Sequence, residues 1–167
     1  MHKHTIPWRL IIICCLMNVH GWKLVYSQTA PLDKVSFQAI TFADANTVIA
    51  VGDSGTIARS TDRGNTWIMW RNVNHITTPL NGVAFIDASV GFAVGANGVL
   101  LMTTNGGMSW MYKLINTTAA LRSIFFSDRM TGTIVGANGS IYHSDDGGNT
   151  WFMQTSGVRP ALNSVVF

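Results

Sequence analysis

The chain has 167 residues, a formal net charge of +3 at pH 7, a hydrophobic fraction of 47% and a charged fraction of only 11%. This composition excludes a disordered chain, because disorder requires low hydrophobicity and a high density of charge. It also argues against a coiled coil, because glutamate is absent and all eight acidic residues are aspartate. The length allows one domain with a hydrophobic core, or part of a larger one.

The excess positive charge lies at the N-terminus. Lys3, Arg9 and Lys23 fall within the first 27 residues, and from residue 28 onward eight basic residues balance eight aspartates. A nucleic-acid-binding protein carries a basic stripe on its folded part. We therefore expect no nucleic-acid partner.

Residues 1–27 have the pattern of a secretory signal peptide, with a basic start followed by an apolar run at residues 10–17. The run is shorter than the roughly 20 apolar residues that a bilayer requires, and small residues favour cleavage after Gly21 or Ser27. The alternative is an uncleaved leader that serves as a membrane anchor. We expect an exported protein, located in the periplasm, outside the cell or at its surface. Both cysteines lie in this leader, so residues 28–167 contain no thiol.

Residues 28–167 contain one unit that is repeated. Trp67, Trp110 and Trp151 are 43 and 41 residues apart, and phenylalanines at positions 42, 85, 126 and 167 are 43, 41 and 41 apart. Each unit holds four short β-prone segments separated by Gly, Asn or Asp, and the fourth begins at the tryptophan. Four strands in about 40 residues are typical of a β-propeller blade.

The predicted fold is therefore all-β, with blades of four antiparallel strands. The blades are expected at about residues 36–72, 79–115 and 120–156, followed by the first strand of a fourth blade at residues 162–167.

An eight-residue motif ends at each repeated tryptophan. Its Asp or Asn side chain can accept backbone N–H groups of the turn, its glycine supplies a positive φ, and its tryptophan buries a large ring between sheets. A calcium loop is the alternative, but it requires more oxygen ligands, so we expect no metal and no cofactor. We assign a structural role to Ser60, Asp62, Gly64, Thr66, Trp67, Thr103, Asn105, Gly107, Ser109, Trp110, Ser144, Asp146, Gly148, Thr150 and Trp151.

The pattern Ser-x-Asp-x-Gly-x-Thr-Trp resembles the Asp-box, or bacterial neuraminidase repeat. The wider unit at residues 93–110, with its counterparts at 51–67 and 135–151, resembles the repeat of the photosystem II stability and assembly factor family. The resemblance covers about residues 36–167 and implies a non-catalytic, seven-bladed propeller that acts as an assembly chaperone or scaffold for a protein partner. The neutral balance beyond residue 27 argues against the specific partner of the photosynthetic members, which use a basic surface.

Seven such blades need roughly 290 residues. We therefore expect an incomplete propeller, and a truncated fragment is the favoured explanation. The alternative is self-association of several chains, which would cover the exposed faces and edges.

The resemblance also indicates where a partner binds. It places ligands on the face formed by the inter-blade connections and the turns between the second and third strands, which include Asp53, Asn97 and Asn138. A polar register lies beside these turns in sequence: Gln38, Asn81, Arg122 and Asn163 occupy one position of the unit, and a small residue follows each. We expect these seven residues to contact a protein partner at the channel entrance. The alternative is that the polar register only satisfies water there.

No catalytic residue is assigned. Sialidase chemistry needs a Tyr–Glu pair, and the chain has no glutamate. Asp44, Asp87 and Asp128 each come two residues after the phenylalanine that closes a first strand, which favours a turn-capping role. The favoured function is an exported, non-enzymatic scaffold. The alternative is a fragment of an Asp-box propeller glycoside hydrolase that cleaves polysaccharide with paired aspartates.

Overall fold

A computed structural model describes residues 35–71 and 73–166 of the chain. All of these residues belong to one compact unit. The predicted signal peptide and its cleavage positions lie outside the described residues. Across the two described ranges, no helix has the length and apolar character needed to span a bilayer.

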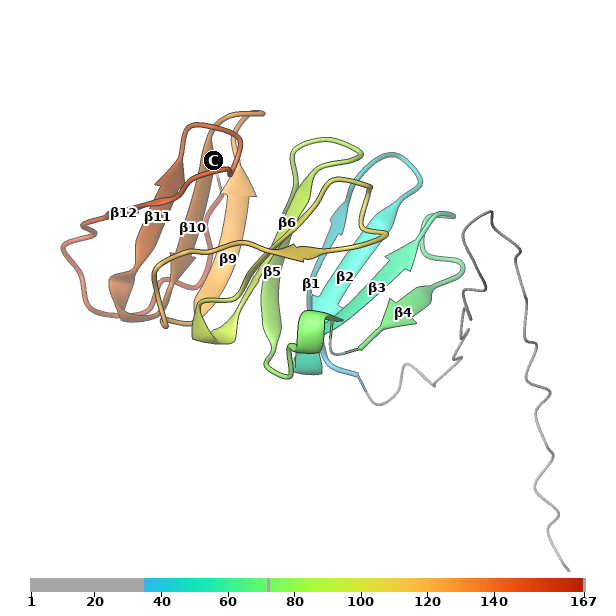
Figure 1. Cartoon of the computed structure of the whole chain (residues 1–167), viewed down its shortest axis with the longest axis horizontal. Coiled ribbons are helices and arrows are strands. Elements are labelled where there is room, and N and C mark those ends of the chain that lie inside the picture. The colour runs from blue at the N-terminus through green and yellow to red at the C-terminus, as the bar shows by residue number, and fades with distance from the viewer. Residues whose placement is uncertain (1–34, 72, 167) are drawn as a thin grey trace, which may run out of the picture. The chain divides into compact units, whose positions relative to one another are not determined.

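The described residues form three four-stranded antiparallel sheets, which we call blades 1, 2 and 3 (Figure 1). Blade 1 contains β1 (Phe37–Phe42), β2 (Val48–Gly52), β3 (Thr56–Ser60) and β4 (Ile68–Trp70). Blade 2 contains β5 (Leu80–Phe85), β6 (Gly91–Gly95), β7 (Leu100–Thr103) and β8 (Met111–Tyr112). Blade 3 contains β9 (Leu121–Phe126), β10 (Gly132–Gly136), β11 (Ile141–Ser144) and β12 (Phe152–Gln154). The predicted all-β fold of four-stranded blades is confirmed.

The fourth strand of each blade begins one residue after the repeated tryptophan, not at the tryptophan as predicted. The tryptophan belongs to the preceding turn instead. In blade 1 the Trp67 indole N–H donates to the Gly64 carbonyl at 2.9 Å, and in blade 3 Trp151 donates to Gly148 at 3.2 Å. In these two blades the indole ring therefore lies over its own turn. In blade 2 the strand likewise starts one residue after Trp110, although the Trp110 indole nitrogen has no such bond.

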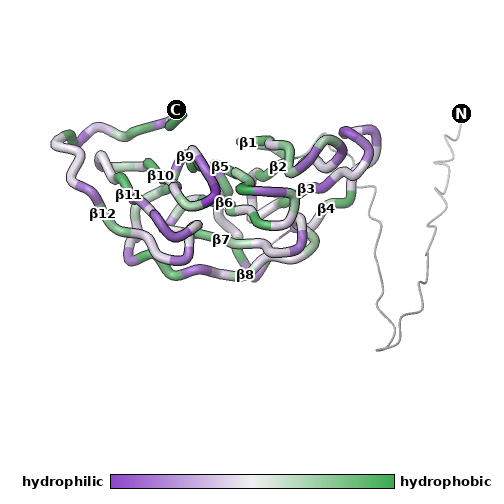
Figure 2. Tube along the Cα trace, turned by 90° about the horizontal axis from the view of Figure 1, so that it is seen from above, coloured by the Kyte–Doolittle hydropathy of each residue, from purple (hydrophilic) through white to green (hydrophobic). Residues whose placement is uncertain are grey.

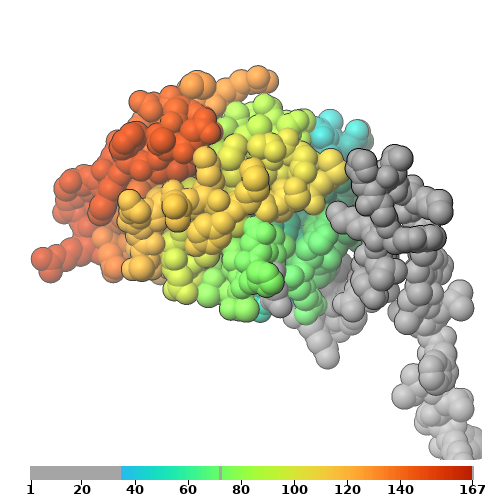
Figure 3. All heavy atoms as spheres, in the orientation of Figure 1, coloured from blue at the N-terminus to red at the C-terminus, as the bar shows by residue number. Residues whose placement is uncertain are grey.

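The three blades lie side by side in chain order, with their first strands along one side. Seen from above, β1, β5 and β9 lie on the same side, and β8 and β12 lie on the other (Figure 2). Because side chains alternate across a strand, each sheet has two faces; blade 2 has one face toward blade 1 and the other toward blade 3. The space-filling view shows neighbouring blades in direct contact (Figure 3).

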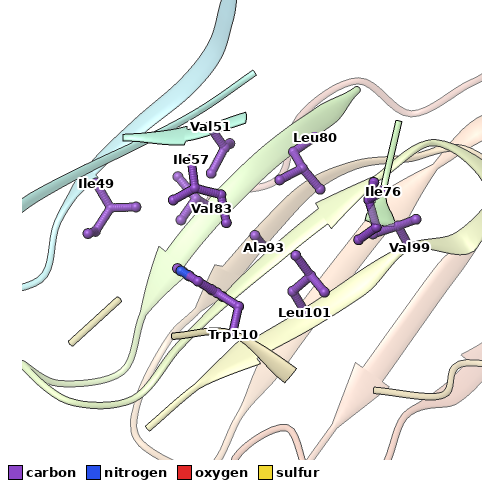
Figure 4. Packing of buried hydrophobic residues seen from close by; sticks show 10 residues of the cluster. All are labelled: Ile49, Val51, Ile57, Ile76, Leu80, Val83, Ala93, Val99, Leu101 and Trp110. Carbon is purple, nitrogen blue, oxygen red and sulfur yellow. The ribbon is translucent and has the colours of Figure 1, made fainter. Parts of the chain in front are cut away.

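The hydrophobic core lies between blades rather than within one. The first cluster joins Ile49, Val51 and Ile57 of blade 1 to Leu80 and Val83 of blade 2, among other residues (Figure 4). A second cluster joins Phe92, Val94 and Leu100 of blade 2 to Leu121, Ile124, Ile134 and Tyr142 of blade 3. Each blade is therefore stabilised mainly by burying apolar area against its neighbours.

The turns between second and third strands pack against the segment of chain that leads to the next repeat. Gly55, Gly98 and Gly139 have φ values of +60°, +69° and +67°, and a Cβ atom on them would lie only 2.0–2.2 Å from a carbonyl oxygen of the connection to the next repeat. The Gly98 amide also donates to the Ala119 carbonyl at 2.9 Å. Only glycine allows both this backbone conformation and this close approach.

Residues 162–166, predicted to begin a fourth blade, form no strand. The first strand of each blade pairs with the second strand of the same blade, and within residues 35–71 and 73–166 this segment has no such pairing partner. The segment nevertheless contacts blade 3 at the expected place. The Leu162 amide donates to the Gly136 carbonyl at 2.9 Å, and the Val165 amide donates to Ser123 Oγ at 3.3 Å.

The close approach at Gly98 predicts a large cost for adding a methyl group there. We expect Gly98→Ala to lower the free energy of unfolding by at least about 3 kcal/mol, because its Cβ would lie 2.0 Å from the Thr117 carbonyl oxygen. Gly157→Ala is the matched control, since Gly157 has φ +72° and a Cβ there would meet nothing within 4 Å. We expect it to cost only about 1 kcal/mol. Urea titration followed by circular dichroism measures both, and equal losses would contradict the role of the Thr117 contact.

Candidate binding face at the first strands

Each residue of the polar register in the three blades is the extra residue of a β-bulge. Phe37 pairs with Gly52 and Ala39 pairs with Val51, so Gln38 is left unpaired in β1. The same shift leaves Asn81 unpaired in β5 and Arg122 unpaired in β9. A bulge re-aims the side chain of its extra residue. Three successive first strands thus present a polar side chain at the same position.

The bulges and the turns between second and third strands lie at the same end of each blade. The amide of Asp53 donates to the Ser36 carbonyl at 3.0 Å, immediately before β1, and the amides of Ala96 and Ala137 make the equivalent bonds at 3.0 and 2.8 Å. Ser54, Asn97 and Asn138 form the exposed tips of these turns. Their φ values are 55°, 58° and 58°, a left-handed conformation in which asparagine is favoured over most residues.

The side chains of the polar register bind to neighbouring groups along this end of the blades. Asn81 Nδ2 donates to the Leu121 carbonyl of blade 3 at 2.7 Å. Arg122 Nη1 donates to Oδ1 of Asn163, and so connects blade 3 to the start of the next repeat. In blade 1, Gln38 Nε2 donates to Asp53 Oδ1 at 3.2 Å. The register is therefore held in place by hydrogen bonds, two of which run from one repeat to the next.

Most of the seven candidate partner-binding residues remain accessible. Gln38, Arg122, Asn163, Asn97 and Asn138 are exposed, and Asn81 and Asp53 are half-buried. Their groups both donate and accept hydrogen bonds, and Arg122 and Asp53 add one charge of each sign. The structure brings Gln38 to Asp53 and Arg122 to Asn163. Asn81 lies at the bulge of blade 2. Asn97 and Asn138 occupy the same turn position of blades 2 and 3, where blade 1 has Ser54.

The motif that ends at the tryptophan forms a closed hydrogen-bonded turn in blades 1 and 3. In blade 1, Asp62 Oδ1 accepts from the Thr66 amide at 2.8 Å and from Ser60 Oγ at 2.7 Å, while Oδ2 accepts from Thr66 Oγ1 at 2.6 Å. Asp146 makes the same three bonds in blade 3, to Ser144 and Thr150. Both oxygens of each carboxylate therefore accept hydrogen bonds from inside their own turn.

Blade 2 closes the same turn with different chemistry. Asn105 Oδ1 accepts from the Ser109 amide and from Thr103 Oγ1, both at 2.9 Å, and its Nδ2 donates to Ser109 Oγ at 2.8 Å. In blade 1 the threonine hydroxyl donates to the carboxylate, whereas in blade 2 the Asn105 amide donates to the Ser109 hydroxyl. The direction of this bond is reversed because an amide group replaces the carboxylate. The indole nitrogen of Trp110 is buried without a hydrogen-bond partner, whereas its counterparts in blades 1 and 3 have one.

A separate group of aspartates, one in each blade, closes the turns between first and second strands. Asp44 Oδ1 accepts from the amides of Asn46 at 2.7 Å and Thr47 at 2.8 Å. Asp87 and Asp128 make the equivalent pairs of bonds in blades 2 and 3. The predicted turn-capping role of these three residues is confirmed.

The hydrogen bonds of these turns keep five carboxyl groups ionised. Bonds from the Thr66 side chain and amide lower the pKa of Asp62 from 3.8 to about 2, and bonds from Thr150 do the same for Asp146. Backbone N–H groups lower the pKa of the other three aspartates. The largest effects come from the amides of Asn46 on Asp44, Val90 on Asp87 and Met130 on Asp128. A general acid needs a raised pKa, so none of the five has the character of one. Within residues 35–71 and 73–166, no cluster of three or more His, Cys, Asp or Glu side chains is placed to hold a metal ion.

A family model described as photosynthesis system II assembly factor YCF48 matches residues 17–104, more than half of the chain. No curated protein matches the chain. Among solved structures, "YCF48 bound to D1 peptide" is 24% identical with a TM-score of 0.68, and covers 76% of this chain and 42% of its own. YCF48 from Cyanidioschyzon merolae is 21% identical with a TM-score of 0.64, and covers 74% and 41%.

A glycoside hydrolase has the same local fold. The GH74 enzyme of Niastella koreensis is 24% identical with a TM-score of 0.57, and covers 71% of this chain but only 22% of its own. These likenesses show a propeller fold. The chain spans about two fifths of the YCF48 structures that it matches.

The lowered pKa values predict how the blades respond to acid. The two most shifted groups, Asp62 and Asp146, have a pKa of 3.8 in an unfolded chain and about 2 in the folded one. Their contribution to the free energy of unfolding is therefore complete above about pH 4 and is lost as the pH falls toward 2. We expect the urea concentration at the midpoint of unfolding to fall as the pH is lowered from about 4 to 2.

The double variant Asp62→Asn, Asp146→Asn tests the assignment. We expect it to be less stable at pH 7 and to show a smaller loss between pH 4 and pH 2, because only Asp44, Asp87 and Asp128 then contribute. Asn105, which already closes this turn in blade 2, indicates that the variant folds. An unchanged acid dependence in the double variant would exclude these two groups as its source.

Proposed function

The chain belongs to the family of the photosynthesis system II assembly factor YCF48, and from this we propose that it is an exported, non-enzymatic propeller scaffold that binds another protein. The proposed site is the end of the blades where the first strands bulge. It comprises Gln38, Asn81, Arg122 and Asn163 of the polar register with the turn residues Asp53, Asn97 and Asn138. The observation that carries this proposal is the β-bulge repeated in three successive blades, which turns a polar side chain out of each ladder.

The chemistry of this face suits a segment of polypeptide. Amide side chains at 38, 81, 97, 138 and 163 each offer both donors and an acceptor, which are the groups that a peptide backbone requires. The bulge residues are fixed by hydrogen bonds to neighbouring groups, so little side-chain entropy remains to be lost on binding. One of the similar structures is described as YCF48 bound to a D1 peptide, which supports a peptide segment as the class of partner.

Export is the second part of the proposal. It is supported by the basic, then apolar, pattern of residues 1–27 and by the confinement of both cysteines to that segment. The remaining chain would need no disulfide, because inter-blade packing supplies its core. An uncleaved leader would place the same scaffold at a membrane surface.

A glycoside hydrolase fragment is the second candidate, favoured by the fold likeness to the GH74 enzyme. Five of the seven aspartates at described positions are bound within turns, and their pKa values are lowered. We therefore expect no release of reducing ends when the chain is incubated with soluble β-glucans at pH 5 to 7. Release that Asp53→Asn and Asp145→Asn together abolish would establish the hydrolase instead.

Site-specific photo-cross-linking tests the scaffold. We expect a benzoylphenylalanine at Asn97, on the proposed face, to give a discrete adduct with one protein in the cells that make the chain. The control position is Met153 on the outer strand of blade 3, which is 71% exposed and should give none. The double substitution Arg122→Ala, Asn163→Ala should greatly reduce the adduct at Asn97. Equal labelling from Met153, or an adduct indifferent to the double substitution, would reject this face as the site.

A further inference from the structure

One residue of the proposed binding face, Asp53, differs in charge from its counterparts in the other blades. It occupies the first position of the turn between second and third strands, where blades 2 and 3 have Ala96 and Ala137. The backbone amides of these three residues make the same bond to the chain before the first strand, at 3.0, 3.0 and 2.8 Å. The turn therefore forms with either side chain, and the Asp53 carboxylate is not required to build it.

Arg122 is a second departure from the repeat. It is the extra residue of the bulge in β9, whereas the bulges of β1 and β5 have the uncharged residues Gln38 and Asn81. Asn163, at the same position of the next repeat, is also an amide. Since the bulge forms with each of these side chains, it does not depend on a cation. The guanidinium group, like the Asp53 carboxylate, has no role in the fold that a neutral side chain could not fill.

These two charges lie in the first and the third blade of one row. We define the row as the bulge residues together with the turns between second and third strands that lie beside them. The first strands β1, β5 and β9 lie side by side in this order (Figure 2), so Asp53 and Arg122 are separated by blade 2. Blade 2 contributes Asn81, Ala96 and Asn97 to the row, and all three are uncharged. The row therefore runs from an anionic position to a cationic one.

Both charged groups are oriented by neutral partners. Asp53 Oδ1 accepts from Gln38 Nε2 at 3.2 Å, and Arg122 Nη1 donates to Oδ1 of Asn163. Bonds to amide groups orient the carboxylate and the guanidinium without cancelling their charges. A carboxylate accepts through two oxygens and a guanidinium donates through five N–H groups, so each group can bind a further partner. Arg122 is exposed and Asp53 is half-buried.

The neighbouring cations do not reverse this polarity. Arg71 and Lys113 directly follow β4 and β8, the outermost strands of their blades. Three strand spacings, together about 14 Å, separate those strands from the first strand of the same blade. Arg159 is exposed and follows Val158, whose carbonyl oxygen lies against Gly139 in the turn of blade 3. It therefore adds positive charge at the blade 3 end, where Arg122 already lies.

The separation of the two charges suits a short extended peptide. Neighbouring blades approach closely at the bulges, since a Cβ on Gly82 would lie 3.2 Å from the Ser123 Cα and 3.3 Å from the Arg122 carbonyl oxygen. Stacked sheets lie about 10 Å apart, and less where small residues meet, so two steps along the row span roughly 10 to 20 Å. An extended peptide covers this span with about three to six residues.

We propose that this face selects a peptide segment that carries one basic and one acidic side chain, about three to six residues apart. The basic group binds Asp53, and the carboxylate binds Arg122, whose guanidinium can donate two parallel N–H bonds to it. Amide side chains between them bind the peptide backbone. Exchanging the two charges of the peptide would place like charges against each other, which opposes binding. This inference rests on the proposed peptide-binding function and adds the charges that the partner must carry.

Selection of random displayed peptides on the immobilised chain tests the proposal. We expect the selected peptides to carry the charge pair at this spacing. Fluorescence anisotropy of a labelled selected peptide should show that Asp53→Ala and Arg122→Gln each weaken binding about fivefold. Both variants should fold, because the repeat itself has alanine and glutamine at these positions in other blades. Arg71→Gln changes the net charge as Arg122→Gln does, but lies outside the row, and should leave the affinity unchanged.

A charge exchange provides the converse test. The double variant Asp53→Arg, Arg122→Asp should bind a peptide whose two charges have been exchanged more tightly than it binds the original peptide. The wild-type chain should show the opposite order of affinities. Circular dichroism verifies that each variant is folded. Equal affinities of the two peptides for both proteins would overturn the proposed charge selection.

The variant Asn97→Ala separates this inference from the proposed function. Peptides that lose affinity in Asn97→Ala, but not in Asp53→Ala or Arg122→Gln, overturn the charge selection and leave the proposed site in place. Peptides indifferent to all three variants bind elsewhere on the chain. That result, or a selection that yields no peptide, overturns the proposed site and this inference with it.

Discussion

Burial between adjacent sheets is the constraint on which this structure depends. A four-stranded blade of about 40 residues is too small to enclose a core, so its apolar side chains must be covered by the next blade. The side chain of Ile49 packs against Gly107 in the tryptophan turn of blade 2, and that of Phe92 packs against Gly148 in the turn of blade 3. Glycine is required at both positions because a side chain there would overlap Ile49 or Phe92. The repeat length, the tryptophan and the glycines all follow from this one packing problem.

The same constraint explains where a binding site arises. Blades that converge along their first strands crowd their backbones there, and small residues such as Ala39, Gly82 and Ser123 allow it. The β-bulge before each small residue turns one side chain out of the ladder. Polar residues at this position then form hydrogen bonds to neighbouring groups. The bonds of Asn81 and Arg122 run to residues of the next repeat. The packing of the fold thus generates an ordered row of hydrogen-bonding groups at one end of the blades.

The repeat spacing was sufficient to predict the blades, because four β-prone segments per period have few other arrangements. The fourth strand begins one residue later than predicted in all three blades, because the tryptophan belongs to the turn, and a β-prone aromatic residue at a strand boundary does not show in the sequence which side it joins. The polar register was visible as a pattern, but its cause was not, because a bulge depends on the pairing of two strands. The bond from Asn81 to Leu121 crosses 40 residues and needs the blades in place. Asp44, by contrast, binds amides two and three residues away, which is why its role could be predicted.

Within residues 35–71 and 73–166, blade 2 is the blade that is covered on both faces, by cluster residues of blade 1 on one side and of blade 3 on the other. In a linear array that is stabilised by nearest neighbours, the middle repeat opens only after one of the flanking repeats has opened. Backbone amides of β6 and β7 should consequently exchange with solvent most slowly, and those of β4 and β12 most quickly. Among the described blades, the residues around Ala93 and Leu101 would then be the last to lose their protection.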